Sequence, residues 1–313
     1  MTWMRRLGLE GAFRADGHLP IVAHRSQWGA DTIESTDMIN SAHGGSWVLR
    51  RGAFDTMLRK TATLAGAIAI SGPAGAVQRT REKWTFEADG EPQHASFLID
   101  ASGRRTAVAR RIGTNPVADD RLVAVSFVTE THIQSDVDQT TLLEASENGW
   151  WYTCRIGACQ RLVSYFSDAD LIPTTAATRS RVLPRSLDAS GPVASLLREH
   201  QYANLEAHEV GAAHSGHLEP MVGGSWMATG DAAVTYDPLC GHGLIAAMDS
   251  ARYAAVALIE LARGNGPALE DYAIGMTAGY QRYRNELRAY YGAETRWKNS
   301  QFWSRRRADA PAG

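Results

Sequence analysis

The chain has 313 residues, of which 44% are hydrophobic and 21% are charged, and its formal net charge at pH 7 is −2. This composition is ordinary for a globular enzyme, and the length allows two subdomains around a large core. The sequence contains no stretch apolar enough to cross a membrane, no secretory signal, and no charge excess typical of nucleic-acid-binding proteins. Its three cysteines lack a Cys-x-x-Cys spacing, so we expect a cytoplasmic protein without a disulfide framework.

The first glycine-rich turn follows an apolar segment and reads Ser71-Gly72-Pro73-Ala74-Gly75-Ala76. A turn that binds a dinucleotide phosphate has the pattern Gly-x-Gly-x-x-Gly between a strand and a helix. This turn lacks the third glycine and opens no helix. We therefore interpret it as a hairpin turn.

The middle of the chain predicts an antiparallel sheet. Alternating and β-branched residues give four strands, at residues 121–131, 140–145, 149–155 and 161–167. A helical stretch over 184–200, interrupted near Gly191-Pro192, and a further strand over 205–212 follow. Within this sheet, Trp150 and Tyr152 either line a pocket for a flat substrate or pack against aromatic residues across the strands.

The most informative segment is residues 226–262. A short strand ends near Ala228, Gly230-Asp231 makes a turn, and Asp237-Pro238 leads to Gly241-His242-Gly243, where a helix begins. The unpaired N–H groups of a helix N-terminus favour negative charge, and glycines let a flat ligand approach the backbone. Asp231 can accept hydrogen bonds from polyol hydroxyls, and Pro238 is rigid and has no N–H to compete with the ligand. An ordinary strand–turn–helix connection is the alternative.

Two features are expected after this segment. The helix that starts at Leu244 has apolar residues at a helical period, which predicts a packed face made of Met248, Ala251, Ala255, Leu258 and Ala262. Residues 267–294 predict a long helix that buries an aromatic stripe. The cluster Arg305-Arg306-Arg307 is interpreted as part of a solvated terminus. His214 and His217 are interpreted as a surface turn rather than a metal site.

The string from Gly230 to Ala251 resembles the second FAD-binding motif of flavin monooxygenases of the aromatic-hydroxylase type, in particular their tryptophan-halogenase-like branch. Residues 98–110 resemble the central strand and the turn near the flavin diphosphate, and residues 47–58 resemble the segment whose arginine reaches the cofactor. The tail from Tyr290 to Arg306 is similar to that branch as well. The cofactor-binding residues that the resemblance implies are Arg51, Asp100, Gly103, Gly230, Asp231, Pro238, Gly241, His242, Gly243 and Leu244.

The resemblance implies a mixed α/β fold. It consists of an incomplete FAD-binding Rossmann-like domain (residues 1–114 and 206–265), an antiparallel-sheet substrate domain (115–205) and a C-terminal helix and tail (266–313). Such flavoproteins normally open with a Gly-x-Gly-x-x-Gly unit of about 30 residues, which holds the diphosphate. The sequence has no such unit, so we expect the 313 residues to bind FAD weakly. A misassigned start, a true truncation, or a second chain that supplies the missing surface would each explain this.

The implied activity is hydroxylation of an aromatic substrate through a flavin C4a-hydroperoxide, with electrons from NAD(P)H or a flavin reductase. Halogenation is not expected, because residues 1–59 contain no lysine and the family's Trp-x-Trp-x-Ile-Pro pattern is replaced at Tyr152, Cys154 and Arg155. Two alternatives remain: a non-catalytic relic or partner subunit, and a flavoprotein that hydroxylates a protein-bound tryptophan during maturation of a quinone-cofactor enzyme. No catalytic acid or base and no metal site is assigned, and the oligomeric state is left open.

Overall fold

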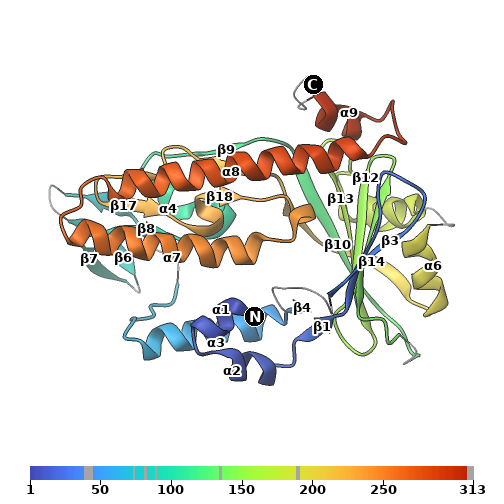
Figure 1. Ribbon diagram of the computed structural model, residues 1–313, viewed down its shortest axis with the longest axis horizontal. Helices are drawn as coiled ribbons and strands as arrows, with labels where there is room; N and C mark the ends of the chain where they lie inside the picture. Colours follow the sequence, from blue (N-terminus) through green and yellow to red (C-terminus); the bar gives the residue numbers. More distant parts are fainter. Residues whose placement is uncertain are drawn as a thin grey trace. The chain divides into compact units, whose positions relative to one another are not determined.

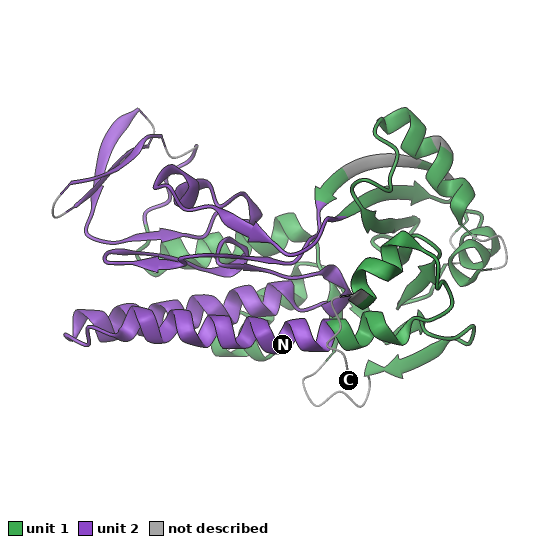
Figure 2. Cartoon of the chain, turned by 90° about the horizontal axis from the view of Figure 1, so that it is seen from above, with its two compact units in different colours: residues 1–67, 123–211, 288–313 green, residues 68–122, 212–287 purple. Residues whose placement is uncertain are grey.

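The structure is a computed structural model that describes residues 1–38, 45–72, 75–80, 83–88, 90–133, 136–187 and 191–308. The chain has the mixed α/β fold that the sequence predicts (Figure 1). It divides into two compact units, one made of residues 1–67, 123–211 and 288–313 and the other of residues 68–122 and 212–287 (Figure 2). The predicted functional division of the chain into three domains stays a prediction. None of the described helices has the length and hydrophobicity that crossing a bilayer requires.

The first unit is built on a seven-stranded sheet with the order β14-β10-β13-β12-β11-β2-β3. The four predicted strands are confirmed, and the sheet consists of β2 (Ala23–Gln27), β3 (Glu34–Asp37), β10 (Leu122–Glu130), β11 (Thr140–Ser146), β12 (Gly149–Arg155), β13 (Gln160–Asp168) and β14 (Ala203–Ala212). β11, β12 and β13 pair antiparallel, as predicted, whereas β2 runs parallel to β11.

One side of this sheet is covered by helices. Trp151 and Val163 lie in a buried cluster with Leu183, Val193 and Leu197. These last three residues come from a short helical run, made of α5 (Ala176–Val182) and η3 (Leu183–Ser186), and from α6 (Pro192–Glu199). The predicted interruption of the helical stretch near Gly191-Pro192 is confirmed. Pro192 is the first residue of α6, where its fixed φ suits the first helical turn.

The N-terminal part of the first unit contains three helices and a small two-stranded sheet, and its tail forms a further helix. These elements are α1 (Thr2–Arg6), α2 (Glu10–Ala15), α3 (Arg51–Leu64), β1 (Leu19–Ile21), β4 (Ser46–Val48) and α9 (Gln301–Ala308). Phe54 is buried at the start of α3, as expected, and its ring lies edge-on to Phe13 of α2.

The interpretation of Arg305-Arg306-Arg307 as a solvated cluster is wrong. Arg305 pairs with Asp168 and Asp170, at 2.7 Å each, and Arg306 pairs with Asp168 at 2.9 Å. Arg307 donates to backbone carbonyls in the loop that precedes α9. The three cations therefore fix α9 within the first unit.

Within its described residues, the second unit contains three small sheets, the α-helices α4, α7 and most of α8, and short 3-10 helices. Its elements are β5 (Val77–Arg79), β6 (Trp84–Ala88), β7 (Glu91–Ala95), β8 (Leu98–Asp100), β9 (Pro116–Ala118), β15 (Gly216–Leu218), β16 (Val222–Gly223), β17 (Trp226–Ala228), β18 (Val234–Thr235), η2 (Gly103–Arg105), α4 (Ala107–Arg111), α7 (Gly243–Ala262) and most of α8 (Ala268–Ala293). The predicted hairpin turn at residues 71–76 falls partly outside the described residues, because Pro73 and Ala74 are not described; residues 67–70 before it form no strand, and β5 begins only at Val77. β8 and β17 are parallel, and α7 and α8 run side by side (Figures 1 and 2).

The existence and extent of α7 are confirmed, but its predicted packed face is wrong. The buried residues are Ser250, Ala254 and Ala257, whereas Ala251 and Ala255 are exposed. Ala254 and Ala257 pack against Met227 of β17. Small side chains therefore make the fully buried contact, and Leu258, which was predicted for this face, and Leu261 pack beside them while only partly buried.

The predicted aromatic stripe on α8 is confirmed for most of its length. Tyr272, Tyr280 and Tyr283 are buried, with exposed fractions of 6%, 3% and 9%. The stripe ends one residue later than predicted, because Tyr290 is exposed and Tyr291 is buried.

Candidate functional site

The turn after β8 is organised by the carboxylate of Asp100, which is 1% exposed. One oxygen accepts hydrogen bonds from the backbone N–H and the hydroxyl of Ser102, at 2.9 and 2.6 Å. The other accepts from the N–H groups of Val108 and Ala109 at the start of α4, at 3.1 and 2.7 Å. This carboxylate therefore serves helix capping and turn geometry. The assignment of Asp100 and Gly103 as cofactor-binding residues stays a prediction. Asp100 would contribute to it by holding this turn in place.

The pairing of β8 with β17 brings two motifs together that are distant in sequence. Asp100 is in register with Ala228, and the N–H of Thr229 donates to the Asp100 carbonyl at 2.9 Å. Gly230 follows with φ of +59°, a conformation that glycine adopts without strain. Its N–H donates to the Ser250 hydroxyl at 2.9 Å, so α7 anchors the turn that presents Asp231.

Asp231 lies beside a guanidinium group. Arg104 Nε is 3.6 Å from the Asp231 carboxylate, and the two side chains are 24% and 36% exposed. That distance is an ion pair rather than a hydrogen bond. Asp231 is therefore placed at the surface of the second unit, with a cation from the neighbouring turn at its side.

The segment between Asp237 and Gly243 forms a short helical turn that is capped at its start. The Asp237 carboxylate accepts from the Leu239 N–H at 2.8 Å, and the Asp237 N–H donates to the Tyr283 hydroxyl at 2.6 Å. Pro238 begins this turn, and Gly241 ends it with φ of +63°. The turn is therefore held at its start by the Asp237 cap and by the hydrogen bond to Tyr283 of α8.

The start of α7 is open to an approaching molecule. A side chain added at Gly241 or Gly243 would meet no atom within 4 Å, and His242 and Leu244 are exposed. The first N–H groups of this 20-residue helix are at the same place. An anion or a flat ligand could therefore approach the backbone here, and the assignment of Asp231 and these glycines to a flavin stays a prediction.

Cys240 lies at the end of the Pro238 turn and packs against the hydrophobic core of the second unit. A thiol next to a helix start can have a lowered pKa, but burial raises the pKa of Cys240 above its ordinary value. Cys240 therefore lies in the environment of a packed thiol rather than a reactive one.

A small cavity lies next to Asp231. Its lining residues are Arg104, Thr106, Pro116, Val117, His214, Gly216, His217, Asp231, Ala232, Ala233 and Thr235. The interpretation of His214 and His217 as a surface turn is wrong, because His214 precedes and His217 lies within β15. The Nδ1 atom of His217 is buried without a hydrogen-bond partner. No group of three potential metal ligands occurs within the described ranges.

We predict an acid-sensitive contribution of His214 to stability. Burial, and next the charge of Arg104, lower the pKa of His214, against an opposing effect of Asp120. Below about pH 6.5 the unfolded chain therefore binds a proton that the folded protein resists, and the free energy of unfolding decreases as the pH falls. Urea unfolding between pH 7 and pH 5 should show a smaller loss for His214→Gln than for the wild type. Parallel pH profiles for the two proteins would contradict this.

The other predicted site residues belong to the first unit. Arg51 is the first residue of α3, and its side chain is 61% exposed and lies 3.4 Å from Asp55. Trp150 is 1% exposed, stacks on Phe166 with ring centroids 3.8 Å apart, and donates from Nε1 to the Tyr291 hydroxyl at 3.1 Å. The packing alternative therefore describes the indole of Trp150. The role of Trp150 and Tyr152 in a substrate pocket stays a prediction, as does that of Arg51 at the cofactor.

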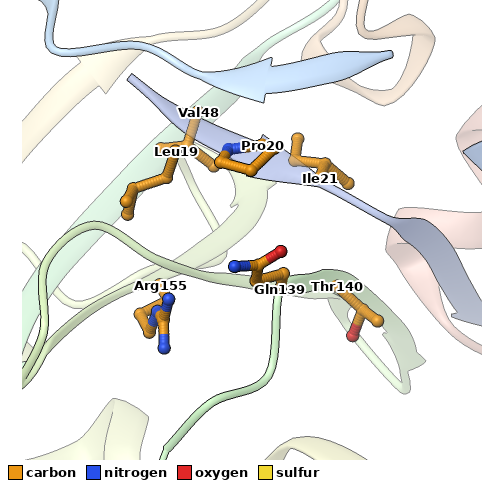
Figure 3. A pocket seen from close by; sticks show the side chains of 7 residues that line it. All are labelled: Leu19, Pro20, Ile21, Val48, Gln139, Thr140 and Arg155. Carbon is orange, nitrogen blue, oxygen red and sulfur yellow. The ribbon is translucent and has the colours of Figure 1, made fainter. Parts of the chain in front are cut away.

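A small cavity of the first unit lies at one end of the large sheet (Figure 3). Leu19, Pro20 and Ile21 of β1 line one side, and Gln139, Thr140 and Arg155 lie opposite. Neither Trp150 nor Tyr152 contributes to its lining. This cavity is therefore separate from the predicted substrate residues.

The comparison with protein families identifies the chain. The model of the family described as tryptophan halogenase matches residues 3–312. The chain belongs to the tryptophan halogenase family. Among curated proteins it is similar to LodB of Marinomonas mediterranea, described as an FAD-dependent oxidoreductase, with 27% identity over 297 residues, which is 92% of this chain and 79% of LodB.

Solved structures with the same fold include a peptidyl tryptophan dihydroxylase and two halogenases. QhpG, described as a peptidyl tryptophan dihydroxylase essential for tryptophylquinone cofactor biogenesis, is 23% identical with a TM-score of 0.79, covering 99% of this chain and 69% of QhpG. The flavin-dependent halogenase CmlS is 22% identical with a TM-score of 0.77, covering 98% of this chain and 59% of CmlS. The flavin-dependent brominase Bmp2 is 20% identical with a TM-score of 0.77, covering 98% and 78%. These similarities confirm the predicted fold.

The structure brings together the motif residues of the second unit and adds three residues to them. Arg104, Ser250 and Tyr283 hold the turns that carry Asp231 and Pro238. Arg104 directly follows Gly103 in the segment of residues 98–110 that resembles a flavin-binding turn. Its place in the sequence therefore indicated a role near this predicted turn. Ser250 interrupts an apolar helix, which is a weaker signal. Tyr283 reads as one more residue of the aromatic stripe.

Proposed function

We propose that this chain carries out the function of an FAD-dependent oxidoreductase that hydroxylates an aromatic ring, and that the ring is a tryptophan side chain within a polypeptide. The main support is the surface formed by Asp231, Pro238, Gly241 and Gly243, which is open at the two glycines and anchored from α7 and α8. The choice of substrate is supported by the similarity to QhpG across 99% of the chain.

The residues present would divide the work in a simple way. Bound FAD would supply the redox chemistry and the activation of O₂, with electrons from NAD(P)H or from a flavin reductase. Asp231 would accept hydrogen bonds from ribityl hydroxyls, and the N–H groups at the start of α7 would favour negative charge on the ring. Pro238 would keep one side of the ring rigid and free of competing donors. Arg51 and the turn held by Asp100 would serve the diphosphate side.

Halogenation is not part of this proposal, although halogenases share the fold. Residues 1–59 contain no lysine, and Tyr152, Cys154 and Arg155 replace the corresponding family residues. These features favour oxygen transfer over transfer of a halogen.

The rival proposal is a chain that retains the fold as a non-catalytic relic or as a partner subunit. The two proposals differ in a measurable way, because only an oxidoreductase needs FAD on the Asp231 surface and oxygen-dependent product.

Asp231→Ala should weaken FAD binding by about 10- to 150-fold, which corresponds to the loss of about 1.5 to 3 kcal/mol from a charged hydrogen-bond acceptor. Quenching of flavin fluorescence during titration into purified protein measures this change, also when the wild type binds weakly. Asp271→Ala is the matched control, because Asp271 is an exposed carboxylate on α8 of the same unit. Equal affinity of the two variants would contradict the assignment of Asp231.

The reaction is tested by mass spectrometry. A tryptophan-containing peptide incubated with protein, FAD, a flavin reductase, NADH and O₂ should gain oxygen, whereas the Asp231→Ala reaction should give much less product. Free tryptophan and a peptide with phenylalanine in place of tryptophan are the substrate controls. FAD binding without oxygen-dependent product would favour the non-catalytic rival, and a brominated product in bromide buffer would overturn the exclusion of halogenation.

A further inference from the structure

Arg104 is located where three segments of the second unit meet. It belongs to η2, directly after the turn that Asp100 organises. Its two terminal nitrogens donate to backbone carbonyls, Nη1 to His214 and Nη2 to Tyr236, each at 2.6 Å. Its Nε lies 3.6 Å from the Asp231 carboxylate. The guanidinium of Arg104 therefore contacts His214 before β15, Tyr236 before Asp237, and the Asp231 carboxylate that is assigned to the cofactor.

These contacts require the geometry of a guanidinium. Arginine presents five N–H donors in a fixed plane, whereas lysine has a single ammonium on a flexible stem. Charge-assisted hydrogen bonds at 2.6 Å are also short and strong compared with neutral ones. A lysine at this position would keep the charge beside Asp231 but could not hold both carbonyls and the carboxylate in one arrangement.

The contact to Tyr236 has the larger consequence for the site. Its carbonyl belongs to the residue immediately before Asp237, and Pro238 follows. The His214 carbonyl has a second donor, the Thr235 hydroxyl at 3.2 Å, which retains this contact without Arg104. The position of the Pro238 turn therefore depends on Arg104 from one side and on Tyr283 from the other.

We infer that Arg104 is a positioning residue of the flavin site, which orients the Asp231 carboxylate and the Asp237-Pro238 turn relative to each other without contacting the cofactor. This inference rests on the proposed function, because Asp231 and Pro238 are the residues assigned to the flavin. Through Arg104, the turn after β8 helps to position the ribityl half of the site, in addition to the place near the diphosphate that was predicted for this turn.

A double-mutant cycle between Arg104→Lys and Asp231→Asn tests this inference. Arg104→Lys alone should weaken FAD binding by about tenfold, as expected for the loss of one charged hydrogen-bonding arrangement. In the Asp231→Asn background the same substitution should cost about threefold or less, since coupled residues are non-additive. Arg263→Lys is the control and should leave the affinity unchanged, because Arg263 is an exposed arginine of the same unit just after the end of α7, far along the helix from Gly243. Equal losses in both backgrounds would overturn the inference.

A second measurement separates positioning from general stability and needs no cofactor. Hydrogen exchange of the ligand-free protein should be faster over residues 230–243 in Arg104→Lys, while the melting temperature stays close to that of the wild type. Unchanged exchange in this segment, or a fall in melting temperature that accompanies faster exchange throughout the unit, would overturn the positioning role. If the wild type and Asp231→Asn bind no FAD, the proposed function fails, and the exchange result still decides whether Arg104 holds the turn.

Discussion

Asp136→Ala is expected to destabilise the protein by about 3 to 5 kcal/mol, because it leaves a buried guanidinium without its counter-charge. The Arg161 and Asp136 side chains both have exposed fractions of 0%. The Asp136 carboxylate accepts from Arg161 Nε and Nη2, at 3.0 and 2.7 Å, and from the Tyr202 hydroxyl at 2.7 Å. Burial alone would raise the pKa of Asp136, but the hydrogen bonds from Tyr202 and Arg161 lower it below the ordinary value.

The loss should be large because the second carboxylate near Arg161, that of Asp138, lies 4.0 Å from Nη2, which is beyond hydrogen-bond distance. The Nη1 atom of Arg161 already lacks a hydrogen-bond partner. Urea unfolding followed by circular dichroism measures the change in the free energy of unfolding. Asp55→Ala is the matched control, because it removes a carboxylate from an exposed pair with Arg51 and should change stability by less than about 0.5 kcal/mol. A loss below about 1 kcal/mol for Asp136→Ala would show that water or a rearranged side chain takes over the carboxylate's role.

Trp303→Ala is expected to cost about 3 to 5 kcal/mol as well, by opening a cavity in an aromatic cluster. Trp303 is 0% exposed, and its ring centroid lies 5.2 Å from that of Trp28 and 5.9 Å from that of Tyr291. Its indole N–H donates to the Ser146 carbonyl of β11 at 2.9 Å. The substitution therefore removes packing and leaves a carbonyl without this donor.

Tyr290→Ala serves as the control for Trp303→Ala, because it truncates a large aromatic side chain in the same region that is 66% exposed. Its effect on the free energy of unfolding should be within about 0.5 kcal/mol. Equal effects of the two substitutions in urea unfolding would mean that α9 is not part of the cooperative core of the first unit.

The elements that could be predicted from the sequence are those in which a single pattern dominates. The four strands between residues 121 and 167 are rich in β-branched and aromatic residues and are separated by turn residues, so their bounds agree closely with β10 to β13. In the long α8, aromatic residues recur at helical spacing and identify the buried side. The strands give no such indication of one buried side, because β12 is buried on both faces.

The pattern was insufficient for α7, in which most residues are apolar. A helix that is apolar on several sides does not reveal its packed side by periodicity. The side chain that identifies it is Ser250, which is buried because it accepts from Gly230 and bonds to Thr229. The hydrogen bond between Gly230 and Ser250 joins residues 20 positions apart. Gly230 lies in the turn after β17, so the bond depends on the position of that turn.

Long-range charge pairing limited the prediction of the site and of the tail. The partners of Arg305 are Asp168 and Asp170, which follow β13, and local composition gives no indication of them. Arg104 likewise reaches the backbone of His214 and Tyr236, more than a hundred residues away. The sequence motifs predicted which turns form the site, whereas the residues that hold these turns depend on the fold.

The packing of α7 through small residues has a practical consequence for work with the protein. Because Ala254 and Ala257 occupy the contact, the large side chains of Ile245, Tyr253, Val256 and Ile259 remain about half exposed, at 53%, 50%, 48% and 51%. Salts such as sulfate strengthen the burial of apolar surface, so they should salt the protein out early. A low-salt buffer with a mild non-ionic detergent should therefore keep concentrated samples monodisperse, which light scattering can follow during purification.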